Sequence, residues 1–77
     1  MTTAVVRVWH ADDGWGVVDA QEVPGGCWVH FSVVDMPGYR ELRAGQQVLL
    51  EFERGEQDGY AYRATRVQVL DEEHLGA

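Results

Sequence analysis

Short runs of β-branched and aromatic residues, each followed by a turn that contains glycine, dominate this 77-residue chain. The runs cover residues 4–9, 15–19, 27–31, 47–54 and 60–70. The fourth run alternates between its two faces with the period of two that is typical of a half-buried strand. The pattern therefore predicts five short strands and no amphipathic helix.

One long connection, residues 32–45, separates the third run from the fourth. Pro37–Gly38 within it limits any preceding helix to a single turn. Closure into a barrel removes the exposed edges that a free five-stranded sheet would keep. We therefore predict an all-β fold, a small five-stranded antiparallel barrel over residues 1–70, with an open sandwich as the alternative. Residues 71–77 are expected to form a flexible acidic tail.

The composition limits the classes of function. Thirteen acidic residues oppose six arginines, and the net charge of −7 disfavours long-range attraction to nucleic acid. The single Cys27 excludes an internal disulfide, and no ligand spacing predicts a metal site. No apolar run reaches the ~18 residues of a membrane helix, and no targeting signal is recognisable. We expect a cytoplasmic protein without metal, cofactor or membrane contact.

The second and third runs are predicted to form a hairpin with a distinct aromatic face. Residues two apart in a strand share a face, so Val18, Cys27 and Val29 point to the core. The opposite face then carries the large aromatic side chains, and simple alternation adds two residues of the first run. The predicted set is Arg7, Trp9, Trp15, Val17, Trp28 and His30, with Phe31 able to turn outward at the strand end.

Exposure of this face is the favoured interpretation. If it were buried, the aliphatic residues of the other face would meet solvent instead. Gly14 and Gly16 are also expected to leave space beside Trp15 for another molecule. Exposed aromatic side chains near an arginine stack unpaired bases, at roughly 1–3 kcal/mol per base. We therefore predict that the face binds single-stranded nucleic acid.

Two motifs resemble those of the bacterial cold-shock family. GWGVV, residues 14–18, resembles its first ribonucleoprotein motif, and WVHF, residues 28–31, resembles its second. The similarity extends over residues 4–69. It implies a five-stranded OB-type barrel that binds single-stranded DNA or RNA with little sequence preference and without catalysis. Such a protein acts as an RNA chaperone or as a regulator of transcription or translation.

The resemblance also implies roles for individual residues. Arg7 stands where the family has a lysine, and three tryptophans stand at phenylalanine positions that stack or flank bases. His30 and Phe31 match the family, and Tyr39 fills an aromatic position of the long loop. Arginines of the last strand and the long loop are candidate phosphate contacts. The predicted nucleic-acid-binding residues are Arg7, Trp9, Trp15, Val17, Trp28, His30, Phe31, Tyr39 and Arg63, with Arg40, Arg43 and Arg66 as further phosphate candidates.

Four departures predict a weakened or retuned site. Val8 stands where the family has an exposed tryptophan, and Val17 replaces a second stacking aromatic. Asp13 replaces a lysine, and His10 replaces an asparagine. Loss of two stacking platforms is expected to weaken binding, and the larger tryptophan rings are expected to recover part of the lost affinity.

Two other classes of function are alternatives to nucleic-acid binding. An enzyme is disfavoured because Cys27 and His30, three residues apart, point to opposite faces, and no nucleophile–base motif or small-molecule site is recognisable. A protein-interaction or dimerisation module is the stronger alternative, since tryptophan is enriched at such contacts. Asp13 favours that alternative, whereas Arg7 and His30 favour nucleic acid. A monomer is the default expectation, and a homodimer stays open.

Overall fold

The computed structural model describes residues 1–36, 38 and 40–70. Its elements are β1 (Thr2–His10), β2 (Trp15–Asp19), β3 (Cys27–His30), the 3-10 helix η1 (Phe31–Val33), β4 (Val34–Asp35), β5 (Gln47–Gln57) and β6 (Tyr60–Val69). All five predicted strands are present. The long connection begins with the single helical turn η1 and contains one unpredicted two-residue strand, β4. The predicted acidic tail lies outside the described residues.

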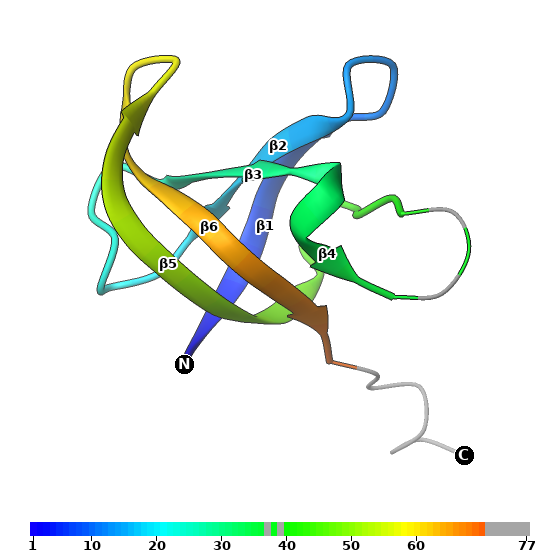
Figure 1. Ribbon diagram of the computed structural model, residues 1–77. Coiled ribbons are helices and arrows are strands. Elements are labelled where there is room, and N and C mark those ends of the chain that lie inside the picture. The colour runs from blue at the N-terminus through cyan, green and yellow to red at the C-terminus, as the bar shows by residue number, and fades with distance from the viewer. Residues whose placement is uncertain (37, 39, 71–77) are drawn as a thin grey trace.

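The strands close into a barrel (Figure 1). The sheet order is β3-β2-β1-β5-β6-β4, and an additional pairing of β3 with β6 closes it. Four strand pairs are antiparallel: β1–β2, β2–β3, β1–β5 and β5–β6. Strands β3 and β4 each pair with β6 in parallel. The predicted five-stranded OB-type barrel is therefore confirmed, and the open sandwich is excluded.

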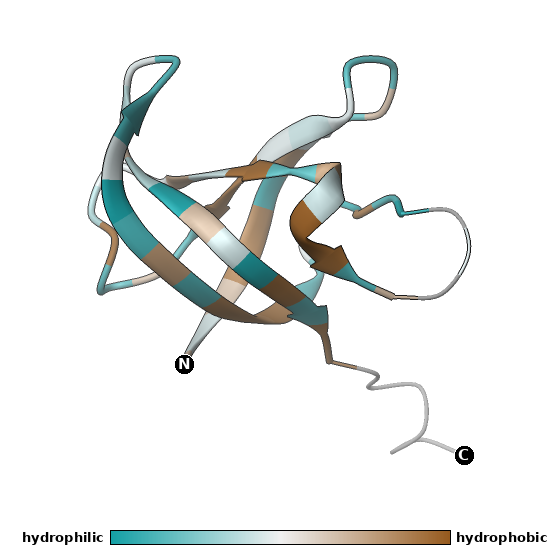
Figure 2. Cartoon of the chain, in the orientation of Figure 1, coloured by the Kyte–Doolittle hydropathy of each residue, from teal (hydrophilic) through white to brown (hydrophobic). Residues whose placement is uncertain are grey.

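The inner face of the barrel is aliphatic and almost completely buried. Figure 2 shows hydrophobic and hydrophilic residues alternating along β5 and β6, as expected for strands with one face toward a core. The largest fully buried side chains of the core are Leu50, Val6, Val18, Val23, Val29, Val34, Val48 and Val67.

Within the described residues, no helix is long and apolar enough to span a membrane.

A register shift in β1 changes which residues face the aromatic side of the barrel. Val6 pairs with Val18, but Val8 pairs with Val17, so Arg7 is an extra residue at this point of the ladder. Beyond the shift Val8 lies on the outer face, and Trp9 lies on the inner face, where it packs against the core. The prediction that Trp9 shares a face with Trp15 is therefore wrong, because simple alternation does not survive a bulge.

Candidate nucleic-acid interface

The hairpin of β2 and β3 brings four predicted site residues to one outer face. Trp15 lies opposite His30, and Val17 lies opposite Trp28 in the antiparallel register. Cross-strand partners share a face of a sheet, so the predicted grouping of these four residues is confirmed. Both tryptophans and His30 are half-buried, which leaves part of each ring accessible.

The rings of this face form a connected series of contacts. The ring centroids of Trp15 and Trp28 lie 6.2 Å apart with an interplanar angle of 24°, and those of Trp28 and His30 lie 5.8 Å apart at 23°. His10 extends the series beyond Trp15 (4.5 Å, 47°), and Phe31 extends it beyond His30 (4.6 Å, 41°). We call these five residues the aromatic row. The three central rings are near-parallel and the two outer rings are tilted, so the row gathers five aromatic side chains within contact of one another.

His10 is the member of the aromatic row that sequence reasoning missed. It is the last residue of β1 and pairs directly with Trp15, the first residue of β2. The short turn between the two strands was visible in the sequence, and hairpin pairing across it would have placed His10 beside Trp15.

Val17 is not part of the accessible surface. Its exposed fraction is 1%, although it lies outside the main core cluster. Val17 sits between Val8 and Trp28 in register, and a Cβ at Gly26 would lie 2.8 Å from both Val17 Cγ1 and Arg7 Nη2. The prediction of an exposed Val17 is therefore wrong, because neighbouring side chains and the Gly26 backbone cover it.

The space beside Trp15 is also filled by the protein itself. A Cβ at Gly14 would lie 2.9 Å from Phe31 Cδ1, and one at Gly16 would lie 2.5 Å from Trp9 Cε3. The expected open space is therefore absent where a Cβ would stand at either glycine, whereas another side of Gly14 lines the cavity described below. The Phe31 amide donates to the Gly14 carbonyl at 2.8 Å, which fixes Phe31 beside the β1–β2 turn with 44% of its surface exposed.

The start of η1 holds the His30 ring in a defined orientation. The Ser32 amide donates to His30 Nδ1 at 3.2 Å, and Ser32 Oγ lies 2.8 Å from the same nitrogen. An amide needs an acceptor, so Nδ1 is unprotonated and a neutral His30 carries its proton on Nε2. Residue 30 therefore combines a stacking ring with one N–H donor.

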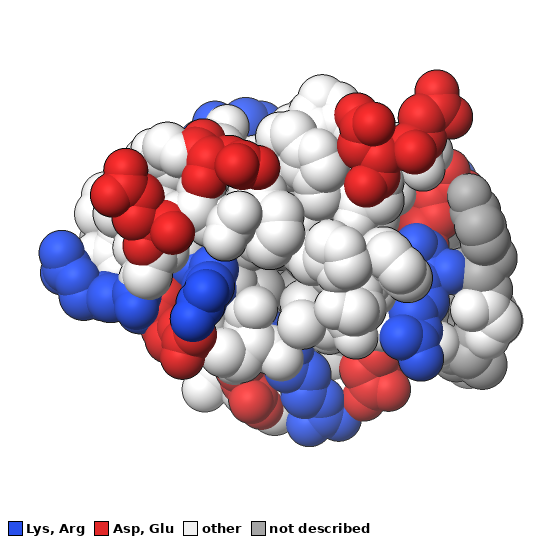
Figure 3. Space-filling view, turned by 45° about the horizontal axis from the view of Figure 1, so that its top comes forward, with Lys and Arg blue, Asp and Glu red and all other residues white. Residues whose placement is uncertain are grey.

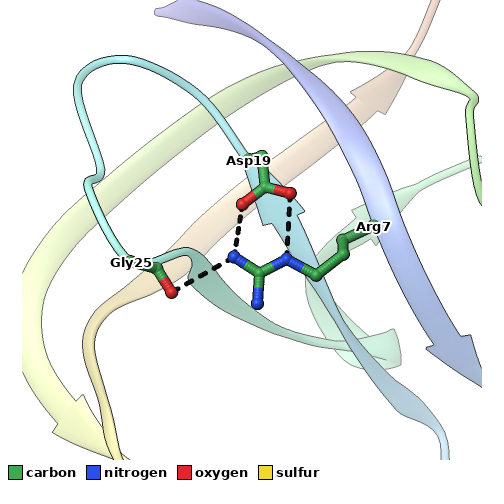
Figure 4. A network of polar contacts seen from close by, with 3 residues as sticks. All are labelled: Arg7, Asp19 and Gly25. Atoms are coloured by element: carbon green, nitrogen blue, oxygen red, sulfur yellow. Dashed lines mark hydrogen bonds and ion pairs between the residues drawn. The ribbon is translucent and has the colours of Figure 1, made fainter.

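Arg7 is already neutralised by an acidic partner (Figure 4). Its Nε donates to Asp19 Oδ2 at 2.9 Å, its Nη2 donates to Asp19 Oδ1 at 2.5 Å, and Nη2 also approaches the Gly25 carbonyl at 3.3 Å. This hydrogen bonding raises the pKa of Arg7 and lowers the pKa of Asp19. The predicted cation of the aromatic face is therefore present but paired.

Arg63 is paired in the same way. It lies opposite Trp28 in the parallel β3–β6 register, so it joins the outer face of the sheet. Its Nε donates to Glu53 Oε2 at 2.7 Å. Arg66 lies further along β6 and pairs with Asp35 of β4 at 2.6 Å.

Acidic side chains border the aromatic face. Asp12 and Asp13 are exposed in the β1–β2 turn, and Glu56 and Asp58 are exposed at the β5–β6 turn. Figure 3 shows an uncharged area bordered both by groups of acidic side chains and by arginine side chains. The two predicted arginines of this face, Arg7 and Arg63, are both paired with acidic side chains, so they add little net positive charge to it.

A cavity of about 470 Å³ opens between the β1–β2 turn and the long connection. Trp9 and Phe31 both line it, so the structure brings these two predicted site residues together beside the aromatic row. Tyr39 lies outside the described residues, and its predicted role stays a prediction. The lining residues are Trp9, Ala11, Asp12, Asp13, Gly14, Phe31, Gly38 and Arg40.

Cys27 lies in the core, on the opposite face of β3 from His30. Burial raises the pKa of its thiol to about 12. A thiol this buried and weakly acidic is a poor nucleophile. Over residues 1–36, 38 and 40–70, no group of three or more histidine, cysteine, aspartate or glutamate side chains is arranged to hold a metal ion.

The barrel and its aromatic hairpin define a small OB-type domain, and comparison with known proteins gives the family. The chain is 33% identical to the cold shock-like protein CspD of Haemophilus influenzae over 79% of this chain and 85% of that protein. It is 32% identical to the cold shock-like protein CspLB of Listeria monocytogenes over 87% of this chain and 100% of that protein. No family model matches the sequence. The chain belongs to the cold-shock protein family, which confirms the resemblance.

Proposed function

We propose that this protein binds single-stranded RNA or DNA by stacking unpaired bases on the aromatic row. The observation that carries the proposal is the near-parallel set of Trp15, Trp28 and His30 rings on one accessible face. Membership of the cold-shock family supports it. Stacking of this kind tolerates any base, because every base has a π-face.

In this proposal most of the affinity comes from stacking. Trp15 and Trp28 are the main platforms, Phe31 provides a third surface, and His30 Nε2–H donates to a base or a sugar. Arg7 and Arg63 are the candidate phosphate contacts, but their charges are compensated by Asp19 and Glu53. Since each phosphate contact contributes about −0.7 to the log–log salt slope, we expect a shallow salt dependence.

Holding bases unpaired would let the protein act in the cytoplasm as an RNA chaperone that melts weak hairpins, or as a regulator of transcription or translation. The protein binds the strand as a monomer and does not catalyse a reaction. A protein-interaction module is the second candidate, favoured by the acidic border at Asp12 and Asp13 and by the ion-paired arginines.

A fluorescence titration separates the two candidates. Oligothymidine and oligouridine are added to the protein at about 50 and 200 mM salt, and tryptophan emission is followed. We expect saturable quenching by both strands and little response to a duplex of the same length. Absence of any response at micromolar protein and low salt, with the fold verified by circular dichroism, would leave the protein-interaction candidate.

A further inference from the structure

The cavity beside the aromatic row has walls and polar groups of its own. Trp9 and Phe31 supply aromatic surface, Asp12 and Asp13 line it from the β1–β2 turn, and Arg40 lines it from the long connection. Its volume of about 470 Å³ lies within the range of sites that hold small-molecule ligands, roughly 300–1,000 Å³. Aromatic walls favour a flat ligand that stacks.

The polar groups of the cavity specify which edges such a ligand must present. Carboxylates accept hydrogen bonds only, and a guanidinium donates only. The ligand therefore needs N–H groups toward Asp12 and Asp13 and acceptors toward Arg40. Within the part of the chain that the structure describes, Arg40 takes part in no ion pair, in contrast to Arg7 and Arg63.

Guanine meets these requirements better than the other bases. Its O6 and N7 are the acceptors that arginine recognises. Its N1–H and N2 amino group form a pair of adjacent donors that matches a carboxylate. Thymine and uracil have one ring N–H each, and adenine and cytosine have one amino group without an adjacent ring N–H.

We propose that the cavity is a guanine-selective subsite, with Asp12 and Asp13 as specificity-determining residues and Arg40 as the partner of O6 and N7. The inference rests on the proposed function, because the guanine belongs to a strand that the aromatic row stacks. It also gives the carboxylates a role. Because the strand is a polyanion, the two carboxylates lower the affinity for every strand. Only a base with two adjacent N–H donors offsets this lost affinity.

Binding of three labelled strands tests the subsite. One is an oligothymidine, the second carries one central guanine, and the third carries inosine, which lacks the N2 amino group, at that position. Fluorescence anisotropy is expected to give roughly tenfold tighter binding for the guanine strand than for oligothymidine, with inosine between them.

Variants of the turn sharpen the test because two effects of opposite sign are expected. Asp12→Asn and Asp13→Asn remove negative charge, so oligothymidine binds more tightly, while the preference for guanine falls severalfold. Asp58→Asn is the matched control. Asp58 is exposed at the β5–β6 turn with φ of 52°, which asparagine tolerates, and it does not line the cavity.

The outcomes separate this inference from the proposed function. If oligothymidine binds but guanine gives no gain, or if the gain persists in both turn variants, the subsite is overturned and the stacking function stands. If the folded protein binds none of the three strands, the proposed function is overturned and the subsite with it. Loss of the guanine preference in the Asp58→Asn control would also overturn the role of the turn.

Discussion

Replacing Asp19 with asparagine should convert Arg7 from a paired side chain into a phosphate contact. In the native protein both hydrogen bonds from Arg7 to Asp19 hold the guanidinium at the edge of the aromatic face. An amide keeps the shape of the carboxylate but removes its charge. The released guanidinium is then available to a strand stacked on Trp28.

The structure sets the size of the effect. The side chains of Arg7 and Asp19 are 44% and 49% exposed, so loss of this surface pair should lower the free energy of unfolding by at most about 1 kcal/mol. One new phosphate contact should steepen the log–log salt slope by about 0.7. When salt is raised from about 50 to 200 mM, the affinity of the variant should therefore fall roughly 2.5-fold more than the affinity of the native protein.

Asp35→Asn is the matched control for this experiment. It removes the same charge and frees Arg66 from its closer partner, leaving the contact with Glu51 at 3.8 Å, and Arg66 lies toward β4 rather than beside Trp28. Both variants change the net charge from −7 to −6, so both should gain the same long-range attraction. Affinities for oligothymidine are measured by anisotropy over a salt series. Equal slopes for Asp19→Asn, Asp35→Asn and the native protein would refute the placement of Arg7 beside the bound strand.

Three further predictions concern stability and reactivity. The pKa of Asp19 is lowered in the folded state, so its pair with Arg7 stabilises above the ordinary aspartate pKa of about 3.9 and the stabilisation is lost as pH falls through the lowered value. Urea unfolding should therefore show a difference between native protein and Asp19→Asn at pH 7 that vanishes in strong acid; a constant difference contradicts this. Gly16→Ala should destabilise by roughly 1–3 kcal/mol, because its Cβ would lie 2.3 Å from a backbone oxygen. Gly55→Ala, whose Cβ would meet only a flexible arginine at 3.2 Å, should cost clearly less in the same denaturation assay, and equal losses would count against the packing described. Cys27, buried and with a thiol pKa of about 12, should react with Ellman's reagent at mildly alkaline pH only after denaturation; rapid labelling of the native protein contradicts its burial.

The fold was predictable because each strand carries its own local signal. Glycine-bearing turns and runs of β-branched residues marked five strands, and the edge argument favoured closure, which the β3–β6 pairing provides. The hairpin was predictable for the same reason. Its short strands contain no bulge, so alternation places Trp15, Trp28 and His30 on one face.

The errors arose where a long-range contact overrides local alternation. The register shift around Arg7 turns Trp9 to the inner face, and the sequence of β1 contains no residue that predicts this shift. The burial of Val17 and the filling of the space at Gly14 depend on side chains from distant segments. The pairing of Arg7 with Asp19 joins residues twelve positions apart, so composition alone could not reveal that the cation is compensated.

The central claim is that unpaired bases stack on the aromatic row, and side-chain NMR during an oligothymidine titration tests it directly. We expect the indole resonances of Trp15 and Trp28 and the ring resonances of His30 to move upfield through base ring currents. Nuclear Overhauser contacts should join these rings to thymine methyl and H6 protons. Binding that leaves all three residues unperturbed, with its contacts on the outer surface of β5, would contradict the account.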